Sequence, residues 1–202
     1  KTDIATLTLA ETTECLAEYD SAHSRFAKSR CKKIQTAPVR CRGYIAEVSH
    51  SAVSELSVEE QYFEAIRSNI IRLHADNCEV DKKTGKSISW GVVRVANIKP
   101  CVELGRYLIN ADWGQDTEAR IMVYHSQQVL IMRHVQEKFL DRLLKRKSSD
   151  DIFNSPVIRR HLDKSKKTSL IYILVATPVE EVGRDHDFSW ALIEPSSFRS
   201  II

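Results

Sequence analysis

Several familiar sequence signals are missing from this chain of 202 residues. It has no run of about 18 apolar residues, so no membrane-spanning helix is predicted. The N-terminal stretch KTDIATLTLAETTE lacks the basic start and apolar core of a secretory signal peptide. It also lacks an initiator Met, and the C-terminal FRSII stops inside an apolar stretch. We therefore expect the sequence to be a piece of a longer polypeptide.

Paired cysteines are also missing. The five cysteines are Cys15, Cys31, Cys41, Cys78 and Cys101, and no two have CxxC spacing. Zinc sites usually draw their ligands from close pairs, so we expect no metal site. An odd number of unpaired cysteines also argues against a secreted disulfide framework. The pattern favours reduced cysteines in a cytoplasmic protein.

Charge is low overall but uneven along the chain. The formal net charge is +3, yet residues 142–167 contain nine Lys or Arg and three Asp, a local net charge of +6. A basic segment on a near-neutral body suits a polyanionic partner, although a solvated surface segment would have the same composition. We expect this segment to be exposed and mobile, with Lys145, Arg146 and Lys147 as candidate contacts to a nucleic-acid backbone.

The first 56 residues are expected to form a helical connector with one possible strand. Residues 1–33 are charged and only weakly amphipathic, whereas CRGYIAEVS (41–49) alternates apolar and polar residues. At Ser57 the pattern changes, because S-V-E-E matches a helix capping box and a regular apolar stripe follows it. We therefore expect a separate domain over residues 57–202.

Apolar runs alternate with helical patterns through that domain. Strands are expected at 90–97, 120–124, 170–176 and 190–194, and a long helix at 129–146. Strands that are apolar along their whole length are buried on both faces, which is typical of a parallel sheet between layers of helices. The predicted fold class is α/β, with a mainly parallel sheet of about five or six strands flanked by helices.

Polar side chains interrupt these apolar strands at their carboxyl ends. Asn97, His125, Ser126 and Thr177 each come at or just after the end of an expected strand. Open α/β sheets place their binding sites at this edge, so the four residues are candidate ligand contacts. His125 next to Ser126 could also suggest a catalytic base, but no partnered nucleophile and acid accompany it. A nucleic-acid contact is the favoured interpretation.

The stretch ILVATPVEEVGRDHDFSWALIEPSS (173–197) carries the most specific pattern. A buried strand delivers Ala176 and Thr177, and Gly183 and Asp185 follow at the spacing A-T-x-x-x-x-x-G-x-D. This arrangement resembles motif V of superfamily 2 helicases. A Thr hydroxyl at a strand end can hold a phosphate, and Gly permits a close backbone approach. Ordinary strand-and-turn punctuation would give a similar spacing.

The wider context resembles the CRISPR-associated helicase–nuclease of type I-F systems. The run VATPVEEVGRDHDFSWALIEPSS is close to the motif V of that family, and GVVRVANIKPCVELGRYL and VYHSQQVLIMRHVQEKFL resemble two further segments. Many relatives have Asn-Thr where this chain has Asn97-Ile98. The resemblance covers residues 57–202 and implies the RecA-like (P-loop NTPase-type) fold of the second lobe of a helicase. It also implies that the motif VI helix, which carries the arginine finger, follows Ile202, the last residue of the sequence.

This resemblance implies a set of ligands and partners. ATP and Mg²⁺ would be shared with a first RecA-like lobe outside this sequence, which contains no G-x-x-x-x-G-K-[ST] loop. Gly183 and Asp185 would face the nucleotide. Asn97, His125, Ser126, Thr177 and the basic residues 145–147 would contact single-stranded DNA. An RNA-guided surveillance complex would deliver that strand, and a nuclease domain elsewhere in the polypeptide would degrade it.

Other interpretations remain open on the sequence alone. The fold could serve as a non-catalytic module that binds nucleic acid or a partner, or as a lobe of an RNA-remodelling helicase. The His186-Asp187 dipeptide could suggest a metal nuclease, but it lies inside the motif V pattern. In each case we expect no catalytic residue within the chain up to Ile202, and no ATP hydrolysis by the isolated chain, because it lacks the phosphate-binding loop and the arginine finger.

Overall fold

The computed structural model describes residues 14–36, 43–46, 48, 54–145, 149–181 and 186–195. The chain divides into two compact units, residues 1–45 and residues 46–202. Within the described part of the first unit, residues 14–36 form the helix α1 (Glu14–Thr36), whose described side chains are mostly exposed. The helical prediction for residues 1–33 is therefore confirmed from Glu14 onward, and residues 1–13 lie outside the described residues.

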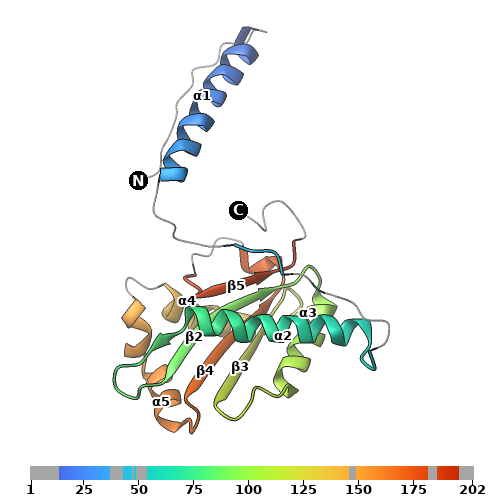
Figure 1. Ribbon diagram of the computed structural model, residues 1–202, viewed down its shortest axis with the longest axis vertical. Coiled ribbons are helices and arrows are strands. Elements are labelled where there is room, and N and C mark those ends of the chain that lie inside the picture. Colours follow the sequence, from blue (N-terminus) through green and yellow to red (C-terminus); the bar gives the residue numbers. More distant parts are fainter. Residues whose placement is uncertain are drawn as a thin grey trace. The chain divides into compact units, whose positions relative to one another are not determined.

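The second unit is built on a five-stranded, mainly parallel sheet (Figure 1). Its strands are β1 (Glu79–Val80), β2 (Ser87–Arg94), β3 (Thr117–Tyr124), β4 (Ser169–Ala176) and β5 (Trp190–Ile193). The strand β4 lies between β2 and β3 and pairs with both in parallel along its whole length. The other edge of β2 pairs antiparallel with β1 at its start and in parallel with β5 at its end.

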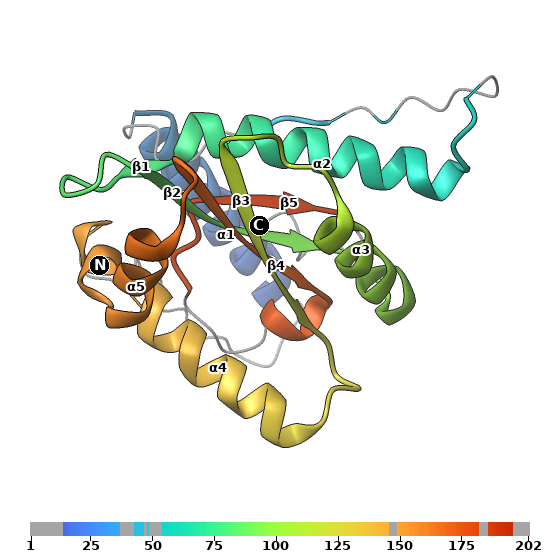
Figure 2. The same cartoon turned by 90° about the horizontal axis from the view of Figure 1, so that it is seen from below.

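Helices cover both faces of this sheet (Figure 2). On one face α2 (Val58–Asn77) and α3 (Ile98–Asn110) supply a first core cluster. On the other face α4 (Leu130–Leu144), α5 (Pro156–Lys164) and the short 3-10 helix η1 (Ser149–Asn154) supply a second cluster. A second 3-10 helix, η2 (Pro178–Glu181), follows β4.

The central strand explains this three-layer arrangement. In β4 the odd-numbered residues of 171–175 belong to the first core cluster, and the even-numbered residues of 170–174 belong to the second. Successive side chains of a strand point to opposite faces, so an unbroken apolar run must have apolar partners on both sides. The predicted α/β class, with a mainly parallel sheet flanked by helices, is confirmed.

Local sequence signals set several element boundaries. Ser57 accepts a hydrogen bond from the Glu60 N–H at 3.2 Å and donates its own N–H to Glu60 Oε2 at 2.9 Å, which is the predicted capping box. Pro156 opens α5 at its first turn, as expected. None of the helices in the described part is long and apolar enough to span a bilayer.

A glycine permits the close contact between β2 and β5. A Cβ atom built on Gly91 would lie 2.1 Å from the ring of Trp190, which real Cβ atoms do not tolerate. Gly91 pairs with Trp190 in the parallel ladder, and the indole lies directly over the glycine. Trp190 is 5% exposed and donates its Nε1–H to Ser89 Oγ at 2.9 Å. This packing fixes β5 against the edge of β2.

The predicted strands all form, with shifted ends. The second strand begins at Ser87 rather than at residue 90, because its first residues pair with both β1 and β4. Pairing with these two distant strands thus overrides the weak strand preference of residues 87–89 (SIS). The possible strand at 41–49 is wrong for its described residues, because 43–46 and 48 lie in neither helix nor strand.

The expectation of a wholly exposed, mobile basic segment is wrong for much of 142–167. Its apolar residues Ile152, Ile158 and Leu162 are each at most 2% exposed and belong to the second core cluster. Arg159 forms a two-point ion pair with Asp81, with Nη–Oδ distances of 2.7 and 2.9 Å. Burial of these three apolar residues anchors the stretch despite its charge. Residues 146–148 lie outside the described part of the chain.

Candidate nucleic-acid edge

The carboxyl ends of the parallel strands lie in register and form one edge of the sheet. The ladder extends one residue past the strands, because Val95 N–H donates to Ala176 O at 2.9 Å and Thr177 N–H donates to Tyr124 O at 3.1 Å. The loops after β2, β4 and β3 therefore leave the sheet side by side. Asn97, Thr177 and the pair His125-Ser126 all lie in these loops.

Thr177 occupies the centre of this edge and is only 5% exposed. Its backbone N–H already binds Tyr124 O. A phosphate contact at this position would therefore involve the side-chain hydroxyl and not the N–H of Thr177 itself. Ser126 in the next loop is exposed and lies in a turn, so it presents a second hydroxyl group at the same edge.

The turn after β3 is fixed by a glutamine that sequence reasoning did not single out. His125 N–H donates to Gln128 Oε1 at 3.2 Å, and Gln128 donates its Nε2–H to Val123 O at 2.7 Å. Gln128 N–H also donates to His125 O at 3.3 Å. A Gln three residues after a strand-end His is a weak signal, since side chains of many types close such turns. The result is a short turn, closed by three hydrogen bonds, that leaves Ser126 exposed.

Two helices begin at the same edge. Asn97 precedes the first turn of α3 and Val129 precedes that of α4, and neither helix has a side-chain hydrogen bond capping its first N–H groups. Unsatisfied N–H groups at a helix start carry partial positive charge. Asn97 is exposed and extended, so its amide adds a polar group beside the start of α3. The edge thus brings together several hydrogen-bond donors.

A buried arginine joins the loops after β2 and β5. Arg94 is 4% exposed and donates from Nη1 to Glu194 O at 2.7 Å. Glu194 Oε2 accepts the Ala96 N–H at 2.9 Å, one residue before Asn97. Burial, and secondarily the charge of Glu194, raises the pKa of Tyr62. Only an Arg inside the apolar run WGVVRVA signalled this contact in the sequence.

The His186-Asp187 pair ties the loop before β5 to α4. His186 Nε2 lies 2.9 Å from Asp141 Oδ1, and Asp187 N–H donates to Leu144 O at 2.9 Å. The hydrogen bond from His186, followed by that from Lys145, lowers the pKa of Asp141. No group of three or more metal-ligating side chains gathers in the part of the chain that the structure describes. The His-Asp dipeptide is accounted for by these packing contacts.

Of the other residues predicted to contact nucleotide or DNA, the structure describes only Lys145. Gly183, Asp185, Arg146 and Lys147 lie outside the described residues. Lys145 is described, is exposed, and forms an ion pair with Asp141 at 3.2 Å. It follows the last turn of α4, at the opposite end of that helix from the His125-Ser126 turn. The structure therefore separates Lys145 from the four residues at the carboxyl edge.

The expected position of the arginine finger also lies beyond the described residues. The sequence interpretation puts the finger after Ile202, and residues 196–202 fall outside the part that the structure describes. The last described residue, Pro195, follows the loop that Glu194 fastens to Ala96. The placement of the finger after Ile202 therefore stays a prediction.

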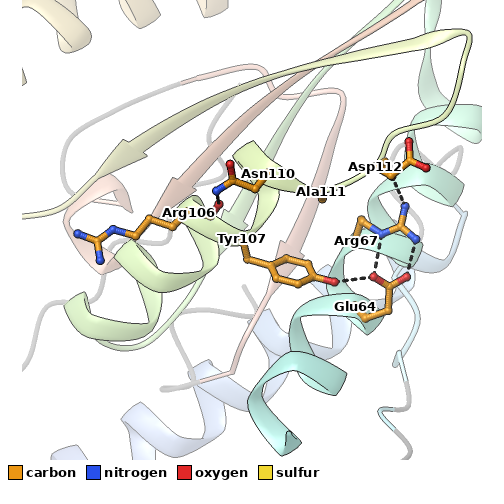
Figure 3. Close-up of a pocket in the computed structure, with 7 residues that line it drawn as sticks. All are labelled: Glu64, Arg67, Arg106, Tyr107, Asn110, Ala111 and Asp112. Atoms are coloured by element: carbon orange, nitrogen blue, oxygen red, sulfur yellow. Dashed lines mark hydrogen bonds and ion pairs between the residues drawn. The ribbon is translucent and has the colours of Figure 1, made fainter. Parts of the chain in front are cut away.

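A hollow of about 560 Å³ lies elsewhere, between α2 and the end of α3 (Figure 3). Figure 3 shows four of its lining residues linked by hydrogen bonds: Arg67 binds Glu64 in two places and donates to Asp112 O at 2.7 Å, and Tyr107 donates to Glu64 at 2.6 Å. Arg67, followed by Tyr107, lowers the pKa of Glu64 to about 2. Burial first, and then Glu64, raises the pKa of Tyr107 to about 12. This network fastens α2 to α3 and includes none of the predicted site residues.

The mainly parallel sheet flanked by helices agrees with the RecA-like fold of a helicase lobe, and comparison with known proteins identifies the family. Residues 87–202 match the family model described as CRISPR-associated nuclease/helicase Cas3, C-terminal. The chain belongs to this family. The resemblance to type I-F proteins is also confirmed, because two curated relatives carry the name CRISPR-associated nuclease/helicase Cas3 subtype I-F/YPEST.

These relatives are much longer than the chain. The protein of Pseudomonas aeruginosa is 32% identical over 93% of this chain, which corresponds to 17% of the relative. That of Pectobacterium atrosepticum is 35% identical over 89% of this chain and 16% of the relative. The chain thus spans about a sixth of the length of the curated relatives that it matches.

Proposed function

We propose that this chain is the second motor lobe of a longer CRISPR nuclease–helicase, and that its carboxyl edge grips single-stranded DNA. One observation carries the proposal: the loops that contain Asn97, Thr177, and His125 with Ser126 follow the ends of adjacent strands and lie side by side. Backbone hydrogen bonds hold these loops in register. Residues far apart in the sequence would then contact successive points on one strand of DNA.

The chemistry of this edge suits phosphate oxygens. Hydroxyl and amide groups donate to phosphates without reading the base sequence. A motor that translocates along DNA requires such sequence-independent contacts. The uncapped starts of α3 and α4 add N–H groups that favour an anion. In this proposal Ser126 and Asn97, which are exposed, make the first contacts, and Thr177 binds from a more enclosed position.

The nucleotide belongs to a cleft shared between two lobes. The residues of this chain do not fit the phosphate-binding half of that cleft, because the sequence has no G-x-x-x-x-G-K-[ST] loop. We propose that Gly183 and Asp185 line the other half, that the arginine finger follows Ile202, and that the first lobe supplies the contacts to ATP and Mg²⁺. A preparation of this chain alone should therefore release phosphate from ATP only at the background rate, with or without single-stranded DNA.

Thr177→Ala in the full-length protein tests the grip. Losing one hydrogen bond to a charged group costs about 1.5–3 kcal/mol, so DNA-stimulated ATP hydrolysis at subsaturating DNA should fall roughly tenfold to a hundredfold. Translocation along single-stranded DNA should fall with it. Thr168→Ala is the matched control, because Thr168 precedes β4 at the opposite end of the strand that Thr177 follows.

The same experiment separates the motor from its rivals. Unchanged hydrolysis and translocation in Thr177→Ala would refute the proposed grip. If the intact protein bound DNA but showed no DNA-stimulated hydrolysis even without substitution, the lobe would be a binding module. Stimulation by single-stranded RNA instead of DNA would assign it to RNA remodelling.

A further inference from the structure

The helix α4 exposes an apolar surface that the core does not use. Its N-cap Val129 and its first-turn residues Leu130, Ile131 and Met132 are 58–75% exposed, and Val135 is 57% exposed. The buried residues of the helix, Leu140, Leu143 and Leu144, all lie in its second half. Figure 2 shows the first turns of α4 at the end of the helix away from α5. The domain thus buries the apolar side chains of the second half of this helix and leaves those of the first half exposed.

The exposed face continues as a basic stripe. Ile131, Val135, Lys138 and Arg142 follow one another at spacings of three and four residues, and all are exposed. Residues at this spacing share one face of a helix. We call this face the α4 stripe: aliphatic in its first two positions and cationic in its last two. Monomeric proteins seldom leave such contiguous apolar surface in water without an interaction to explain it.

The composition of the α4 stripe favours a protein partner over nucleic acid. Its apolar half contains aliphatic side chains and no aromatic ring, whereas binding of bases relies on aromatic stacking. Phosphates would match the cationic half but would leave the aliphatic half in water. A helix with an aliphatic end and a cationic end instead fits a protein groove that is apolar along one part and bordered by carboxylates along the other.

We propose that the α4 stripe docks on another domain of the same polypeptide, in an aliphatic groove bordered by Asp or Glu. This inference rests on the part of the proposed function that makes the chain one portion of a longer protein, and not on its motor activity. Curated relatives are about six times as long as the chain, so most of such a polypeptide lies outside it. A tethered domain has an effective concentration in the millimolar range, which favours it over a free second copy.

Cysteine alkylation in the full-length protein tests the docking. Ile131→Cys and Ile109→Cys are a matched pair, because Ile131 is 65% exposed and Ile109 is 63% exposed, on different helices. Maleimide labelling, followed for each peptide by mass spectrometry, should be about tenfold slower at position 131 if the docked state predominates by tenfold. The two rates should become equal in denaturant. Equal rates in native buffer would overturn the proposal, and Val135→Cys provides a second position should Ile131→Cys fold poorly.

Further arms of the experiment identify the occupant. Protection that disappears on dilution would assign the groove to a second copy, and protection that requires added single-stranded DNA would assign it to nucleic acid; either result overturns the proposal. A carbodiimide cross-link from Lys138 to an Asp or Glu beyond the present sequence supports it. Charge reversal in Lys138→Glu should speed labelling of Ile131→Cys. None of these readouts needs ATP hydrolysis, so failure here is distinguishable from failure of the motor.

Discussion

The ion pair between Arg159 and Asp81 fastens α5 to the turn before β2, and Arg159→Ala should destabilise the domain strongly. The Asp81 side chain is only 3% exposed and that of Arg159 is 22% exposed. Removing the arginine leaves a buried carboxylate with the N–H and hydroxyl donors of Thr84, at 3.0 and 2.6 Å. Breaking a buried pair costs about 3–5 kcal/mol. Because Thr84 still satisfies part of the charge, we expect a loss near the lower end of that range, about 3 kcal/mol.

Urea unfolding of the chain, followed by circular dichroism, measures this loss. With a denaturant slope of about 2 kcal/mol per molar, the midpoint should fall by about 1.5 M. Arg160→Ala is the control, since Arg160 is the next residue of the same helix and is exposed. Its effect should stay within about 0.5 kcal/mol. Equal losses in the two variants would refute the role given to the ion pair.

The dependence on pH gives an independent check. Arg159, followed by Thr84, holds the pKa of the Asp81 carboxyl well below its usual range. A lowered folded-state pKa stabilises the protein above the unfolded-state pKa of about 3.9, and this stabilisation is lost as pH falls towards the folded-state value. The difference in the free energy of unfolding between wild type and Arg159→Ala should therefore be constant near neutrality and should shrink below about pH 4. A gap that widened in acid would contradict the assignment.

Three further predictions concern other parts of the domain. Burial lowers the pKa of His74, so acidification from about pH 7 to pH 5 should destabilise wild type more than His74→Gln in urea titrations. Gly91→Ala should cost about 1–3 kcal/mol and lower the melting temperature measured by calorimetry, because the new methyl group would displace Trp190. Reversing the basic residues 145–147 to Glu should weaken binding of single-stranded DNA by the full-length protein. Titrations at several salt concentrations should show a log–log salt slope smaller by about 2.

Much of the fold followed from local sequence signals because each coincides with a strong physical constraint. The capping box at Ser57 and the proline that opens α5 fix helix starts through hydrogen bonds and backbone angles within a few residues. The run LIYILVA could be buried only between two apolar layers, which required a central strand. These constraints act over short distances, so the sequence alone displays them.

The missed features depend on partners that are distant in the sequence. Arg94 stands out inside an apolar run, but nothing near it in the sequence indicates that its guanidinium binds the carbonyl of Glu194, 100 residues later. Arg159 reads as part of a charged surface segment until Asp81 is brought beside it by folding. Charge alone therefore misjudged the basic segment, whereas three buried apolar residues decided its position. Hydrophobic burial of several side chains outweighs the small free energy gained by exposing a mobile charged loop.

The segment that resembles helicase motif V combines anchoring and proposed binding in separate residues. Before the undescribed residues 182–185, the Thr177 N–H is bound to Tyr124 O; after them, His186 binds Asp141. Further on, Ser189 N–H donates to Trp90 O, and Glu194 joins the loop of Asn97. His186 and Glu194 thus have structural contacts that account for their presence. Thr177, Gly183 and Asp185 remain the residues that we propose to contact DNA and nucleotide. A substitution of His186 should therefore lower mainly the stability of the domain. A substitution of Thr177 should lower mainly DNA binding and DNA-stimulated ATP hydrolysis.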